Sequence, residues 1–110
     1  MAQLNVDETV EEMLKAAKIV LKSRWPLAKE YATNEFKQIT DTIVYIQTEV
    51  NHGRMTQETA KSHLDGQKNT TKMVLLTLEG LDLLVAEAAI NAALNAVRGM
   101  VNKALGVDVL

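Results

Sequence analysis

The residues best suited to chemistry form a Glu-x-x-His spacing near the middle of the chain. Glu49 and His52 stand three positions apart, so on a helix their side chains project from one face. In ferritin-like di-iron proteins, two such motifs and two further glutamates converge inside a four-helix core. Glu35 lies on the same flank of the helical pattern. A dimer that supplies Glu35, Glu49 and His52 twice would hold iron or manganese in a carboxylate site.

A structural interpretation of the same residues competes with the metal site. Glu35 and Glu49 lie about 21 Å apart along one helix, so only an antiparallel partner brings them together. His52 stands at a predicted helix C-terminus, where a cation is favoured. Glu58 and His63 follow the next turn and allow a surface metal site at that tip, although a solvated tip is favoured. We therefore expect no catalytic residue and no cofactor, and iron or manganese only under the alternative.

Composition narrows the classes of function. The 110 residues include no cysteine, which removes disulfides, thiolate metal sites and cysteine nucleophiles. Aromatic residues are only 4% and the net charge is −2, so we expect no nucleic-acid partner. The first ten residues lack the basic and apolar regions of a secretory signal, and no uncharged apolar stretch approaches the roughly 20 residues of a spanning helix. We expect a cytoplasmic protein without a membrane partner.

The first half of the chain has the pattern of one long helix. Apolar residues recur every three or four positions across residues 10–50, which is the α-helical repeat. Either Asn5, with Glu8 three residues on, or Asp7 can cap the start, and Gly53 can end the helix in the left-handed conformation. Pro26 predicts either a kink or a break that places it at the first position of a second helix. Because the apolar stripe crosses Pro26 in phase, we expect a kinked first arm over about residues 7–52.

The second half has a similar pattern after a turn at residues 53–55. Thr56 is a good N-cap, and the apolar stripe then alternates steps of four and three residues, the heptad repeat of a coiled coil. The segment around Gly66 is the weakest helix former, but the unbroken phase favours a continuous helix. We expect a second arm over about residues 56–104 and a short tail over residues 105–110.

Two arms of nearly equal length around a short turn predict a long antiparallel helical hairpin. All of residues 1–110 would then form a single all-α domain. At about 1.5 Å per residue, each arm would be roughly 70 Å long. Folding the chain about residue 54 sets Phe36 opposite Thr71 and Leu21 opposite Val85.

The second arm also carries a second apolar stripe, which lies off the hairpin seam. A helix that is apolar around most of its circumference is buried on several sides. This surface would be covered by another subunit, by lipid, or by the chain itself if it folded at Pro26 and Gly66 into a four-helix bundle. We favour another subunit, so that oligomerisation completes a helical bundle. The predicted oligomer interface comprises Met73, Leu76, Leu83, Leu84, Ile90, Leu94, Val97 and Val101.

These patterns predict a self-associating helical protein with a structural or interaction role and no catalytic activity. Its expected partner is a second copy of itself. A ferritin-like metal protein with a site assembled across a dimer is the alternative. A membrane-active amphipathic protein is the further alternative, against which the acidic residues of the second arm and the absence of a basic face both count.

Overall fold

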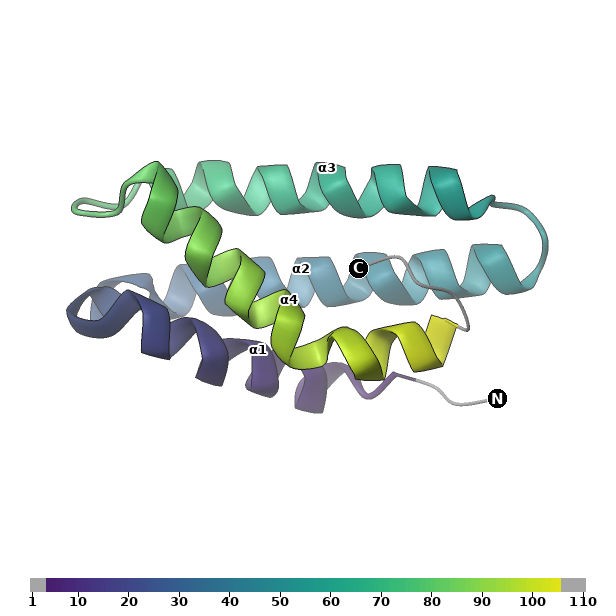
Figure 1. The fold of residues 1–110 in the computed structure, drawn as a ribbon, viewed down its shortest axis with the longest axis horizontal. Coiled ribbons are helices and arrows are strands. Elements are labelled where there is room, and N and C mark those ends of the chain that lie inside the picture. Colours follow the sequence, from purple (N-terminus) through teal and green to yellow (C-terminus); the bar gives the residue numbers. More distant parts are fainter. Residues whose placement is uncertain (1–3, 106–110) are drawn as a thin grey trace.

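A computed structural model describes residues 4–105, with side chains to residue 103, and is all-helical, as predicted (Figure 1). Its elements are the helix α1 (Val6–Leu21), a 3-10 turn (Lys22–Arg24), and the helices α2 (Trp25–Asn51), α3 (Gln57–Leu76) and α4 (Leu83–Leu105). No strand occurs within the described range. The turns 22–24 and 77–82 lie at one end of the molecule, and the turn between α2 and α3 lies at the other.

The four helices form a bundle within one chain. Helix α1 packs against α2 and α4, and α2 packs against α3. Helix α4 runs obliquely, starting beside the end of α3 and crossing toward α1 (Figure 1). The centre is filled by side chains from all four helices, and the largest of those that are fully buried are Met13, Phe36, Ile39, Ile43, Ile46, Leu64, Leu75, Val97 and Val101.

Of the two candidate caps for the first helix, Asn5 is the one used, and the predicted cap Thr56 is confirmed. The side chain of Asn5 accepts a hydrogen bond from the backbone N–H of Glu8 at 3.0 Å, and α1 begins at the next residue, Val6. Thr56 caps α3 in the same way by accepting from the N–H of Thr59 at 3.1 Å. Each cap satisfies one of the helix N–H groups that lack an intrahelical partner. Gly53 has φ 71°, the left-handed conformation expected at the turn.

The prediction of a kinked first arm is wrong, because the chain breaks before Pro26. Helix α1 ends at Leu21, and Lys22 turns the chain with φ 50°. Pro26 then lies in the first turn of α2, where its missing N–H has no intrahelical partner to lose. The apolar stripe stays in phase across the break, but α1 folds back and packs against α2.

The prediction of one uninterrupted second arm is also wrong. Gly66 lies inside α3, which is continuous, and the break comes later, at residues 77–82. Gly80 reverses the chain with φ 83°, and the Asp82 carboxylate accepts from the N–H of Val85 at 2.9 Å to begin α4. The longest dimension of the molecule is 43 Å, well short of the roughly 70 Å of unbroken arms.

Because the chain folds back at residues 22–24 and 77–82, it buries four of the eight predicted oligomer-interface residues within the bundle itself. Ile90, Leu94, Val97 and Val101 are buried in the bundle, so a second subunit cannot reach them while the bundle stays closed. The other predicted interface residues are Met73, Leu83 and Leu84, which are exposed, and Leu76, which is half-buried. The predicted tail beyond α4, with Gly106, lies outside the described residues.

Candidate functional site

Glu49 lies in the last turn of α2 and is held by Arg54 across the following turn. The Arg54 Nε donates to Glu49 Oε2 at 2.7 Å, and Nη2 donates to Oε1 at 3.2 Å. The Arg54 backbone N–H also donates to the Glu49 carbonyl oxygen at 2.9 Å. A bidentate guanidinium–carboxylate pair fixes both side chains more firmly than a single contact does. The predicted ligand Glu49 is therefore occupied by a cation of its own chain.

The hydrogen bonds from Arg54 lower the pKa of Glu49 from its ordinary value of 4.5. Desolvation opposes this shift in the pKa, whereas the positive charge of Arg54 acts in the same direction as the hydrogen bonds. A carboxyl whose pKa is lower in the folded state stabilises the fold above its ordinary pKa, and that contribution is lost as the pH falls through the lowered value. We expect Arg54→Gln to raise the pKa of Glu49 toward 4.5. An NMR titration of the Glu49 side chain measures it, and an unchanged midpoint contradicts the assignment.

His52 follows α2 and forms a different contact from that of a metal ligand. Its Nδ1 lies 2.7 Å from the carbonyl oxygen of Thr48, one turn earlier in the helix. The residue borders a cleft of about 420 Å³ between the start of α1 and the end of α2. Leu4, Val6 and Val44 form its apolar wall, and the other lining residues are polar, namely Gln47, Thr48, Asn51 and His52.

Glu35 is a buried carboxylate on the seam between α2 and α3. It is 7% exposed, and the hydroxyl of Thr71 donates to its Oε1 at 3.3 Å. Within residues 4–103 no cation pairs with it. The hydrogen bond from Thr71 joins α2 to α3 across the seam.

We expect Glu35→Gln to change the unfolding free energy by less than about 1 kcal/mol, because the amide oxygen can still accept the hydrogen bond from Thr71. Urea unfolding measures the change, with the more exposed Glu49→Gln as the control, for which only a small loss is expected because its ion pair with Arg54 is partly exposed. A loss of more than about 1 kcal/mol in Glu35→Gln would contradict this expectation and show that the carboxyl group itself is required there.

The three predicted metal ligands do not converge within one chain. Glu35 and Glu49 both lie on α2, and no group of three histidine, aspartate or glutamate side chains among the described residues is arranged to hold a metal ion. At the tip, His63 instead packs edge-on against the ring of Tyr45, with ring centroids 6.0 Å apart. A metal site assembled across a dimer stays a prediction.

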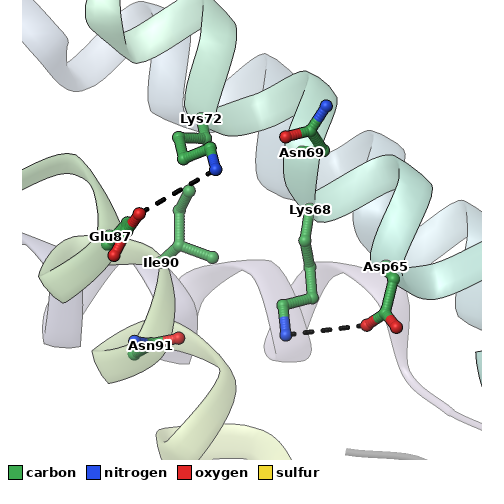
Figure 2. A pocket seen from close by; sticks show the side chains of 7 residues that line it. All are labelled: Asp65, Lys68, Asn69, Lys72, Glu87, Ile90 and Asn91. Atoms are coloured by element: carbon green, nitrogen blue, oxygen red, sulfur yellow. Dashed lines mark ion pairs between the residues drawn. The ribbon is translucent and has the colours of Figure 1, made fainter. Parts of the chain in front are cut away.

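A groove separates α3 from α4 where the oblique course of α4 takes it away from its neighbour. It has a volume of about 270 Å³, and Figure 2 shows the buried side chain of Ile90 between polar walls. Lys72 reaches across to Glu87 at 3.9 Å, whereas Lys68 pairs with Asp65 on its own helix, also at 3.9 Å. Such long, partly exposed ion pairs contribute little to stability. The contact between α3 and α4 is therefore weak along this groove.

The exposed apolar side chains gather at one end of the bundle. Of the seven large apolar or aromatic side chains that stay exposed in the described part of the chain, five lie within four residues of the turns 22–24 and 77–82. These five, which we call the end cluster, are Ile19, Leu27, Met73, Leu83 and Leu84. Sequence reasoning missed Ile19 and Leu27, because they become neighbours of a turn only if the chain breaks before Pro26.

Helix α4 is also long and apolar enough to cross a membrane, by length and composition only. The stretch Leu83–Lys103 meets that criterion, and 39% of its most apolar window is buried inside the bundle. The core helix of a globular protein has the same properties, because it too must be apolar on several faces. This feature therefore does not distinguish a membrane protein from a bundle.

Comparisons with protein families, with curated proteins and with solved structures find no match for this chain.

Proposed function

We propose that this protein is a non-catalytic helical module that associates with a second copy of itself. The contact would lie at the end of the bundle that carries the turns 22–24 and 77–82. The observation that carries the proposal is the end cluster. Leu84 is 77% exposed and Met73 is 59% exposed, although the chain buries half of the apolar stripe to which they belong, namely Ile90, Leu94, Val97 and Val101. Single exposed leucines are common on proteins, but several at one end favour an interaction surface.

A second copy is the partner that the sequence and the surface favour. The end cluster draws on all four helices, and an isologous contact would bring two identical apolar clusters together. Burying a leucine side chain fully contributes about 1.5–3 kcal/mol, so a few of these residues supply a useful part of a dimer's affinity. The net charge of −2 presents little repulsion between two copies.

We expect Leu84→Glu to weaken self-association by at least about tenfold, because each subunit then loses an apolar contact and gains a charge at the interface. Glutamate in the first turn of α4 is favoured by the helix dipole, so helix content should be unchanged by circular dichroism. Sedimentation velocity of the variant against the wild-type protein measures the effect.

Tyr45→Glu is the matched control, since it also replaces an exposed apolar residue by glutamate. Tyr45 lies in α2 toward the opposite end of the bundle and is 52% exposed. We expect it to leave self-association unchanged. An equal loss of self-association in both variants would rule out the end of the bundle with the turns 22–24 and 77–82 as the site of association.

A further inference from the structure

The bundle is composed of two antiparallel pairs of helices that share one register. In the α2–α3 pair, Tyr45 contacts His63, and these residues stand nine positions before and nine after Arg54. In the α1–α4 pair, the hydroxyl of Thr9 lies 3.3 Å from the sulfur of Met100, and these stand 45 before and 46 after Arg54. Both pairs therefore have the register of a single long hairpin, although this hairpin is folded back on itself at the two turns that connect the pairs.

The hairpin is folded back on itself at residues 22–24 and 77–82, and a contact between these two turns fits the same register. The guanidinium of Arg24 packs against Gly80, so the two turns that connect the helix pairs touch each other. Both turns lie at the same end of the bundle (Figure 1). Opening both of them would swing the α1–α4 pair away from the α2–α3 pair as one unit, without breaking either pair internally.

The two turns have the features of hinges for domain exchange. The turn 22–24 has only three residues, and Lys22 has φ 50° with ψ −119°, a conformation that a residue with a Cβ rarely adopts. Short connections under strain favour exchange of identical elements between chains. Opening the hinge releases that strain, whereas Pro26 limits how straight it becomes, because proline inside a helix causes a kink.

We propose that the self-associated form is an exchanged dimer, in which the α1–α4 pair of each chain packs on the α2–α3 pair of the other. The inference rests on the proposed self-association and specifies how it occurs. Contacts between the pairs, such as the buried contact of Thr40 with Met13 at 3.6 Å, re-form between chains. The end cluster flanks both hinges, so opening them brings these residues from two chains together where the hinges cross.

The sparse contact along the α3–α4 groove lowers the cost of opening. Lys72 and Glu87 form the one ion pair between α3 and α4 among the described residues, at 3.9 Å. Figure 2 shows these two side chains meeting across the groove. They lie on different helix pairs, which makes their positions a direct reporter of exchange.

Cross-linking distinguishes exchange from surface contact. Since the chain has no cysteine, Lys72→Cys with Glu87→Cys places one thiol on each wall of the groove, and a short bismaleimide then joins them. The full-length protein is refolded from denaturant at high concentration, and its dimer is isolated before cross-linking. Exchange predicts denatured, cross-linked species at twice the 12.1 kDa chain mass. Tyr45→Cys with His63→Cys is the matched control and should cross-link within one chain, because both positions lie in the α2–α3 pair.

Each outcome decides a separate question. Cross-links at 12.1 kDa for both cysteine pairs in an isolated dimer would overturn exchange and leave association by surface contact intact. Interchain cross-links for both pairs would show that they join neighbouring surfaces, which also overturns exchange. Failure to form any dimer would overturn the proposed self-association and exchange together.

Hinge variants give a second test that does not depend on the cysteines. Lys22→Gly accommodates the positive φ without strain, so it should favour the closed monomer and weaken dimerisation by about tenfold. Pro26→Ala permits α1 and α2 to continue as one helix and should strengthen dimerisation. Changes in the same direction for the two variants, or no change in either, would contradict the hinge.

Discussion

Replacement of Val97 by aspartate is expected to unfold the protein, with a loss of more than about 4 kcal/mol. Val97 is fully buried in α4 and belongs to the apolar core of the bundle. A carboxylate there would lose its hydration without gaining a partner. Because domains of this size have only about 5–15 kcal/mol of stability, little folded protein should remain. Circular dichroism and urea unfolding measure the loss.

The control for this prediction is Leu84→Asp, which changes the same predicted interface stripe at an exposed position. Leu84 is 77% exposed in the single chain, so at low protein concentration the aspartate stays hydrated and the unfolding free energy of the monomer should change by at most about 0.5 kcal/mol. An unbroken hairpin that uses Val97 for association would instead give a folded monomer for Val97→Asp. That result would contradict the bundle formed within one chain.

Phe36→Ala is expected to reduce the unfolding free energy by about 3–5 kcal/mol, because it removes the largest fully buried side chain and leaves a cavity. Phe36 lies in α2 among core residues, where the neighbouring side chains cannot collapse fully into the space. Guanidinium unfolding at low protein concentration measures the monomer's stability without a contribution from association.

Tyr31→Ala is the matched control on the same helix. Tyr31 is 46% exposed, so truncation of this aromatic side chain should cost much less than truncation of Phe36. Equal losses in the two variants would mean that Phe36 is not part of the core described for α2.

The all-α fold and the helix starts follow from the sequence because their causes are local. Asn5 and Thr56 each provide a side-chain acceptor at a helix start, and Gly53 adopts the left-handed conformation that few other residues tolerate. The seam positions follow from the 3.6-residue repeat, which places Thr71 against Glu35, beside the predicted partner Phe36.

The two breaks, unlike the helix starts, could not be predicted from periodicity, because the apolar stripe stays in phase across them. At Pro26 the same residue fits a kink or a helix start, and packing of α1 on α2 decides for the latter. At the second break, Gly80 followed by Asp82 is the sequence signal of a helix stop and a new N-cap. Leu78 and Leu81 continue the stripe through that signal and conceal it.

The candidate site was predictable only in part, since it depends on how the helices meet. The exposed positions Met73, Leu83 and Leu84 belong to the predicted interface, whereas Val97 and Val101 on the same stripe are buried once α4 crosses toward α1. The helical repeat identifies an apolar face that must be buried, but it does not identify which helix covers that face. That choice is set by the positions of the breaks.

Sedimentation equilibrium of the wild-type protein across the micromolar range tests the central claim most directly. Self-association predicts an average mass that rises above the 12.1 kDa of one chain with concentration and approaches twice that value. A single folded species of 12.1 kDa at every concentration would contradict it.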